Sequence, residues 1–288
     1  MAFRLQHQIQ TEDYVTSITP SPSQPLLLAP CASGSIKVLD PSTLACAATL
    51  QTTSPISEVV FGPSAANTVY VGGMDGSISL FDMRTMSPVA RLDAGASVLS
   101  ISLNAAGTVL AAGTELAEKA GPEGEDVARL LMCLINLYNI TGDLSEEDSL
   151  YQVIKSNSIS KIGFFGPQYE YIFAQTHVET YGLYKFEEAE TVKEFGDVRT
   201  VMQGTGGGFA LDYLVDTVFD APSGRLYLVV GTQSGNLGIL NVSLDSMEVV
   251  FSLNGGHQDI VRGVHWNIAQ RMLVSGGEDG VVSLWRNV

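Results

Sequence analysis

Short apolar runs occur in pairs along the chain, and a turn separates the two members of each pair. Four of these turns share a Ser or Asp, then a Gly, then alternating apolar and polar positions, at residues 33–40, 75–82, 234–241 and 279–286. Gly readily adopts the positive φ that such tight turns require. Another apolar run precedes each turn, at residues 26–31, 69–73, 226–231 and 272–277. The pattern predicts a β-hairpin that is repeated along the chain.

Two weaker copies of the hairpin lie between the clear ones. Residues 135–139 follow an apolar run at 109–113, and residues 180–184 follow a run at 171–175. The six hairpins end near residues 40, 82, 139, 185, 241 and 286. A period of about 40–45 residues is typical of propeller blades with four short strands. The two longer spacings predict insertions at residues 114–129 and 197–212.

The last repeat resembles a WD repeat. It contains Gly256-His257, Val261–Trp266, Ser275–Gly280 and Leu284-Trp285. The resemblance implies a hydrogen-bonded structural tetrad formed by His257, Ser275, Asp279 and Trp285. Blade two keeps only Asp75 and Phe81 of this set, and blades one and five have Ser33 and Ser234 in place of the Asp. Blades that lack the tetrad are therefore expected to depend more on apolar packing.

The resemblance to WD repeats covers nearly the whole chain, and a narrower one covers residues 212–286. There the chain is similar to the WD repeat-containing protein 89 group, in the motifs at residues 212–215, 228–232, 255–257 and 276–279. We therefore expect an all-β WD-repeat β-propeller in one domain, residues 1–288. Six four-stranded blades are readable, and seven, the commoner number in the family, stay open as an alternative.

Closure of the ring is expected to involve both ends of the sequence. The last repeat reaches its third strand at residues 281–286, and residues 3–10 alternate apolar and polar positions as a strand does. We expect residues 3–10 to supply the missing outer strand, which removes exposed sheet edges. The inner strands are predicted at residues 15–19, 58–61, 98–103, 159–164, 215–219 and 261–266.

Composition narrows the class of protein. Of the 288 residues 45% are apolar and 16% charged, and the formal net charge is −16. This excludes a disordered chain. The chain has no apolar run of membrane-spanning length and no apolar signal-peptide core at its start, so we expect neither a membrane span nor secretion. Cys31, Cys46 and Cys133 are read as buried thiols in the cytoplasm or the nucleus.

The excess of acidic over basic residues indicates which kinds of partner the protein binds. Basic residues are nowhere clustered, so direct binding to nucleic acid is not expected, whereas an acidic surface attracts basic partners. The best candidate contacts lie in the first insertion: Glu115, Glu118, Glu123, Glu125 and Asp126. A second acidic group, Glu146–Asp148 with Glu187, Glu188 and Glu190, is expected on the opposite face. Both groups are read either as solubilising loop charges or as a dock for basic segments.

A short motif suggests a different role. Phe81-Asp82-Met83-Arg84 resembles the Trp-Asp-x-Arg box by which some WD-repeat proteins serve as substrate receptors of cullin-type ubiquitin ligases. Phe stands where that box has Trp, and the motif also ends blade strands for structural reasons alone. Arg84 is therefore a candidate contact for a ligase adaptor.

Signals for catalysis are weak. Gly204–Gly208 is interpreted as a flexible loop, because a phosphate loop needs a following helix and a Lys. The four histidines have no metal-ligand spacing, and the predicted inner strands contain only Glu58 and Asp216 as acids. A metal-dependent propeller hydrolase stays as an alternative. We expect a non-enzymatic scaffold without cofactor or metal that binds other proteins, as a monomer or as a subunit of a complex.

Overall fold

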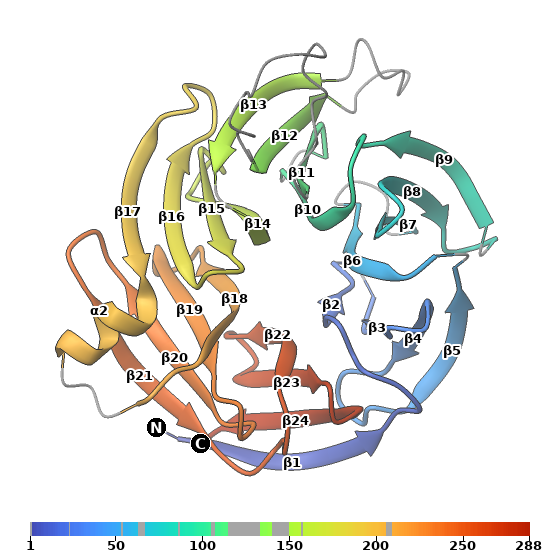
Figure 1. Cartoon of the computed structure of the whole chain (residues 1–288). Helices are drawn as coiled ribbons and strands as arrows, with labels where there is room; N and C mark the ends of the chain where they lie inside the picture. Colours follow the sequence, from blue (N-terminus) through green and yellow to red (C-terminus); the bar gives the residue numbers. More distant parts are fainter. Residues whose placement is uncertain are drawn as a thin grey trace, which may run out of the picture.

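The chain folds as an all-β propeller, in which four-stranded antiparallel sheets, called blades below, surround a central axis (Figure 1). The computed structural model describes residues 2–22, 24–52, 54–62, 67–85, 87–104, 107–114, 133–139, 150–156, 158–205 and 209–288. The strands within these ranges form six such sheets. The prediction of an all-β propeller is confirmed.

The first three blades follow chain order from the axis outward. Blade 1 comprises β2 (Thr19–Pro20), β3 (Leu27–Pro30), β4 (Ser35–Leu39) and β5 (Cys46–Gln51). Blade 2 comprises β6 (Ile56–Phe61), β7 (Thr68–Gly73), β8 (Ser77–Asp82) and β9 (Ser87–Asp93). Blade 3 comprises β10 (Val98–Leu103), β11 (Val109–Thr114), β12 (Cys133–Asn139) and β13 (Leu150–Ser156).

The last three blades have the same order, but blade 6 takes its outer strand from the start of the chain. Blade 4 comprises β14 (Ile159–Phe165), β15 (Tyr171–Thr176), β16 (Thr180–Lys185) and β17 (Thr191–Asp197). Blade 5 comprises β18 (Tyr213–Asp220), β19 (Arg225–Gly231), β20 (Leu237–Val242) and β21 (Met247–Leu253). Blade 6 comprises β22 (Val261–Asn267), β23 (Met272–Gly277), β24 (Val281–Asn287) and β1 (Phe3–Gln10). β1 pairs with β24 from Phe3↔Asn287 to Gln10↔Val281.

The turns that enter the third strands have the predicted backbone. Their glycines Gly34, Gly76, Gly235 and Gly280 have φ angles of 87°, 83°, 80° and 68°. This left-handed region costs a residue with a Cβ about 1–2 kcal/mol. The repeated Gly is therefore a backbone requirement of the hairpin.

Apolar clusters fill the interfaces between neighbouring blades, and six such clusters are described. The interface between blades 6 and 1 is typical: Val15, Leu27 and Leu39 of blade 1 pack with Val274 and Leu284 of blade 6. The faces of each blade are thus covered by its neighbours, and burial of this apolar surface stabilises the ring.

The inner strand of blade 1 differs from the prediction. Only Thr19–Pro20 forms β2, while Val15 makes an isolated bridge to Cys31. The N–H of Val15 donates to the carbonyl of Gly277 in blade 6 (3.1 Å), so this segment is shared between two blades. Pro30 of β3 lies opposite this segment and has no N–H to donate, so it cannot support a longer β2 strand.

The second insertion contains a helix that was not predicted. α2 (Val198–Thr205) follows β17 and buries Val198 and Met202 in the apolar cluster between blades 4 and 5. Gly204 and Thr205, predicted as loop, belong to this helix, and Gly206–Gly208 lie outside the described residues. No described helix is long and apolar enough to traverse a bilayer.

Candidate functional site

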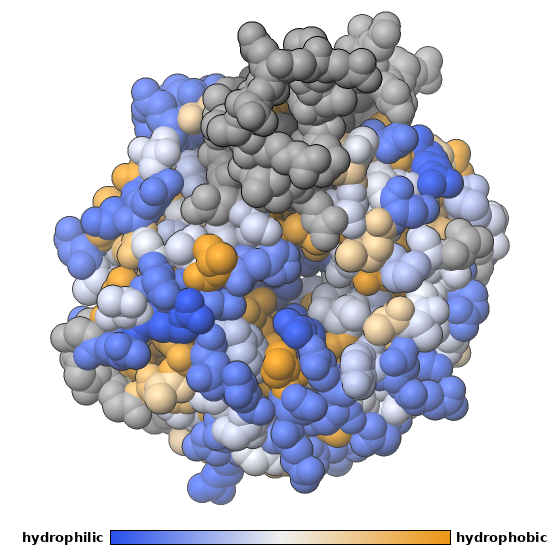
Figure 2. All heavy atoms as spheres, viewed as in Figure 1, coloured by the Kyte–Doolittle hydropathy of each residue, from blue (hydrophilic) through white to orange (hydrophobic). Residues whose placement is uncertain are grey.

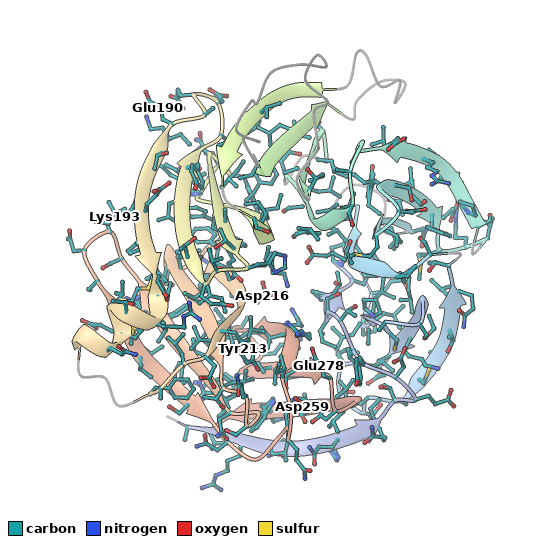
Figure 3. All side chains as sticks on the ribbon, in the orientation of Figure 1. Glu190, Lys193, Tyr213, Asp216, Asp259 and Glu278 are labelled. Atoms are coloured by element: carbon teal, nitrogen blue, oxygen red, sulfur yellow. The ribbon has the colours of Figure 1, made fainter. Side chains whose placement is uncertain are left out.

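Three charged side chains from different blades meet in the central channel. The Lys161 ammonium of β14 lies 3.0 Å from Asp216 Oδ2 of β18 and 3.5 Å from Glu58 Oε1 of β6. We call Glu58, Lys161 and Asp216 the channel triad. Figure 3 shows Asp216 beside the central opening. The sequence pointed to the two acids but not to Lys161, because the metal-dependent alternative requires acidic or Asn side chains on the inner strands.

Hydrogen bonds extend the triad to the neighbouring strand β10. The Ser100 hydroxyl donates to Glu58 Oε2, and the N–H of Ile101 donates to the same oxygen (3.1 Å). The hydroxyl oxygen of Ser100 in turn accepts from the N–H of Ile162 (3.2 Å). Polar contacts therefore connect the inner strands of blades 2, 3, 4 and 5 around the axis.

The charges of the channel triad disfavour a nucleophilic lysine and a bound metal ion. Burial alone would lower the pKa of Lys161, but the carboxylates of Asp216 and Glu58 outweigh it and hold that pKa above its usual value. Burial raises the pKa of Glu58, and the Lys161 ammonium counteracts this. Lys161 thus stays a cation between the two acids. No group of three or more His, Cys, Asp or Glu within the described ranges could hold a metal ion.

The channel widens on both sides of the triad. One cavity of about 170 Å³ is lined by the starts of the inner strands, and another of about 350 Å³ is lined by their ends. Glu58 and Lys161 line both cavities. Antiparallel pairing places the start of each inner strand beside the end of the next strand, as in Val98↔Thr114 and Val261↔Gly277. α2 leads into the start of β18, so we call this side of the propeller the α2 face.

Carboxylates on the α2 face are fixed by backbone N–H groups. Four of these carboxylates accept such bonds at distances between 2.6 and 2.8 Å: Asp13 from Tyr14 and Ser33, Asp93 from Gly95, Asp212 from Gln233 and Asp259 from Ile260. For Asp13, the bond from Tyr14 contributes most to a pKa below its usual value. Figure 2 shows both hydrophilic and hydrophobic residues around the central hollow.

The arginines on this face are already paired. Arg199 makes a two-pronged ion pair with Asp197 (2.8 and 2.9 Å), and Arg262 binds Glu278 (2.6 Å). Within the part of the chain that the structure describes, neither Asp212 nor Asp259 has a Lys or Arg within ion-pair distance. Among the described residues, no ion pair neutralises the charge of these two exposed carboxylates.

The acidic residues predicted as the dock lie outside the described residues: Glu115, Glu118, Glu123, Glu125 and Asp126. The same is true of Glu146–Asp148 in the second group. The structure does place Thr114, the first residue of the predicted first insertion, on the α2 face. Glu187, Glu188 and Glu190 are exposed after β16, and Lys185 approaches Glu188 and Glu190 at 3.8 and 3.9 Å.

Arg84 folds back onto its own motif. Its Nε and Nη2 donate to the Asp82 carboxylate at 3.1 and 2.7 Å, and its N–H donates to Asp82 Oδ1 at 2.9 Å. Asp197-Val198-Arg199 makes the same three contacts. The geometry is therefore that of a local Asp-x-Arg turn, which occurs twice among the described residues.

The four tetrad residues of blade 6 form a chain of hydrogen bonds. Asp279 can only accept, so His257 Nδ1–H donates to its carboxylate (3.2 Å). Burial lowers the pKa of His257. In the neutral ring Nε2 accepts from the Ser275 hydroxyl (2.7 Å), whose oxygen accepts from Trp285 Nε1–H (2.9 Å). Blade 2 has a smaller relay, in which the Ser77 hydroxyl donates to Asp75 (2.7 Å).

Two other sequence interpretations can be compared with the structure. Cys31 is buried, and burial raises the pKa of its thiol, whereas Cys46 is exposed on the outer strand β5. The prediction that Cys46 is buried was wrong, because an apolar run on an outer strand faces solvent. His265 is half-buried beside Trp266, and burial lowers its pKa to about 4, so it is neutral.

Comparisons with known proteins agree with this fold. A family model described as "WD domain, G-beta repeat" matches residues 247–286, the span from β21 through β24. The chain is 26% identical to the WD repeat-containing protein GTS1 of Arabidopsis thaliana, over 99% of this chain and 85% of that protein. It is 25% identical to a WD repeat-containing protein 89 homolog of Dictyostelium discoideum, over 77% and 68% respectively.

A third relative is the WD repeat-containing protein YNL035C of Saccharomyces cerevisiae, 28% identical over 96% of this chain and 79% of that protein. Proteins with WD-repeat propellers generally mediate protein interactions. The predicted resemblance is confirmed, including the narrower similarity to the protein 89 group. The chain is thus similar to WD-repeat β-propeller proteins, and its residues 247–286 match the model of that repeat.

Proposed function

We propose that this propeller is a non-enzymatic scaffold whose α2 face binds basic segments of partner proteins. The observation that carries this is the set of four carboxylates on the α2 face that backbone N–H groups fix: Asp13, Asp93, Asp212 and Asp259. Among the described residues, none of the four has a Lys or Arg within ion-pair distance. The net charge of −16 adds a long-range field that speeds encounter with basic partners. We include Glu115, Glu118, Glu123, Glu125 and Asp126 in the proposed dock, because the chain enters the first insertion at Thr114 on this face.

Apolar side chains on the same face offer anchors for such a segment. Tyr14, Met74 and Val178 are 54%, 43% and 54% exposed, and all three lie in turns of the α2 face. Anchors of this kind supply most of the affinity at protein interfaces, while surrounding charges set the on-rate and the salt dependence. The surface fits a basic segment that also carries apolar residues.

The first experiment is affinity purification of the tagged protein at low and high salt, followed by binding measurements with the captured basic protein. We expect two charge-reversal variants to lower the association rate about tenfold or more. The first is the double variant Asp212→Lys and Asp259→Lys. The second is the triple variant Glu123→Lys, Glu125→Lys and Asp126→Lys. The control is the double variant Glu194→Lys and Glu248→Lys, which makes the same charge change as the first variant but on the outer strands β17 and β21. If the control lowers the association rate as much as the first variant does, the effect comes from net charge alone, which would refute a dock on the α2 face.

A ubiquitin-ligase substrate receptor is the second candidate, carried by the exposed Arg84 at the end of the Asp82–Arg84 motif. The identical turn at Asp197–Arg199 favours a structural role for Arg84. Arg84→Ala with Arg199→Ala as matched control separates the two readings. Co-purification of the ligase adaptor that falls with Arg84→Ala alone would support the receptor role. An adaptor retained by both variants, or absent from wild type, would remove it.

We also infer that the six described sheets are the complete set of blades and that β1 closes the ring. The pairing of β1 with β24 and the apolar cluster between blades 6 and 1 support this. Residues 1–288 would then form one domain, acting as a monomer or as a subunit of a complex in the cytoplasm or the nucleus. Its lack of a metal or cofactor is likewise part of the proposal, which the Lys161 cation in the channel supports.

A further inference from the structure

A cluster of aromatic rings lies on the side of the propeller opposite the α2 face, where blades 4 and 5 meet. Phe165 at the end of β14 stacks on Tyr171 at the start of β15, with ring centroids 5.3 Å apart. Phe219 near the end of β18 meets Phe165 edge-on at 6.1 Å. All three side chains are half-buried, so each also presents part of its surface to solvent. Tyr169, in the turn before Tyr171, is 38% exposed.

Carboxylates surround these rings. Glu170 adjoins Tyr171, Asp220 adjoins Phe219, and the exposed Glu187, Glu188 and Glu190 follow β16. Lys185, which pairs with Tyr171 across the sheet, is held by Glu188 and Glu190. Arg225 lies opposite Asp220. This surface therefore has five acids and two bases in the described loops, a balance that favours a cationic partner.

In the part of the chain that the structure describes, no Lys or Arg makes a cation–π contact with these rings. Among the described residues the cation–π contact is made elsewhere, by Lys193 over Phe195 (5.7 Å) on β17. Phe219 also lines the 350 Å³ cavity, whose floor is the channel triad with its two carboxylates and one ammonium. A cation placed over Phe165, Tyr171 and Phe219 would thus face aromatic π-surfaces, flanking carboxylates and a net negative cavity floor.

We propose that the surface formed by Phe165, Tyr169, Glu170, Tyr171 and Phe219 is a second docking site, specific for arginine side chains of a partner protein. The planar guanidinium stacks on aromatic rings and pairs with carboxylates in a fixed geometry, whereas the lysine ammonium is a strongly hydrated point charge. None of these residues lies on the α2 face, so the site stands independently of the dock proposed there.

The test measures fluorescence anisotropy of two labelled peptides, one of four Arg-Gly repeats and one of four Lys-Gly repeats, with the whole chain. We expect the arginine peptide to bind more tightly, and Tyr171→Leu to weaken it about two- to fivefold, because Leu keeps the apolar contact and loses the π-face. Tyr171→Phe keeps the ring and should retain binding. Tyr169 has φ 59°, so Tyr169→Asn removes its ring with a residue suited to that backbone.

The aromatic site and the α2-face dock predict different effects of these variants on peptide binding. Weakening by Tyr171→Leu and Tyr169→Asn, with little change for Asp212→Lys and Asp259→Lys, supports the aromatic site whether or not the α2 face binds anything. Equal affinity for the two peptides, or an arginine preference that Tyr171→Leu leaves intact, overturns it. Weakening by the α2-face variants alone also overturns it, since the peptide then binds at the other face.

Discussion

Replacing Lys161 with Met is expected to destabilise the propeller by about 3–5 kcal/mol, among the largest effects of any single substitution outside the apolar interfaces. The Lys161 side chain is 14% exposed, and those of Glu58 and Asp216 are 12% and 16% exposed. Without the ammonium, two poorly solvated carboxylates lie near each other with no counter-charge. The measurement is the midpoint of urea unfolding at pH 7, followed by circular dichroism.

The pH dependence gives this prediction its internal check. Removing Lys161 removes the interaction that lowers the pKa of Glu58, so burial raises that pKa further. A carboxyl whose pKa is raised in the folded state contributes stability below its unfolded pKa and loses it as pH rises. The deficit of Lys161→Met should therefore be smaller at pH 5 than at pH 7. A deficit that does not change with pH would contradict the triad as its cause.

A triple variant serves as the matched control. Lys161→Met combined with Glu58→Gln and Asp216→Asn removes both buried charges along with their cation. Gln at residue 58 still accepts from Ser100 and Ile101, so the connection to β10 survives. We expect this variant to recover most of the lost stability and to lose the pH dependence.

The blades could be predicted from the sequence because their signals are local. Gly34, Gly76, Gly235 and Gly280 each mark a turn with positive φ, and the alternation that follows each one matches a strand. The channel triad gives no such signal. Lys161 is an isolated base in an apolar strand, and Asp216 is 55 residues further along the chain. Only the circular arrangement of the blades brings them together.

Two further differences have equally physical reasons. α2 buries only one pair of apolar side chains, Val198 and Met202, and lies beside a glycine-rich stretch. Its pattern is therefore too short to indicate a helix without the core that it covers. Cys46 lies in an apolar run, but β5 is an outer strand whose exposed positions face solvent. Sequence patterning identifies a strand more readily than its distance from the axis.

Replacing Trp285 with Ala is expected to cost about 3–5 kcal/mol, the usual range for a buried large aromatic. The indole is 1% exposed in the cluster between blades 5 and 6. It packs so closely on Gly256 that a Cβ there would lie 2.0 Å from the ring. The loss should appear as a lower urea midpoint and exposure of the remaining tryptophan, which fluorescence detects.

The chain's two tryptophans allow the hydrogen bond of the tetrad to be separated from packing. Trp285 Nε1 donates to Ser275, whereas Trp266 Nε1, also a buried atom, has no hydrogen-bond partner in the described structure. Both Trp→Phe substitutions remove one indole N–H and a similar volume. Trp285→Phe should cost about 1–2 kcal/mol more than Trp266→Phe, because only the former leaves a buried partner with an unmet bond. Equal costs would mean that the relay through Ser275 and His257 adds nothing to apolar packing in blade 6, and that the blades without a tetrad lack nothing essential.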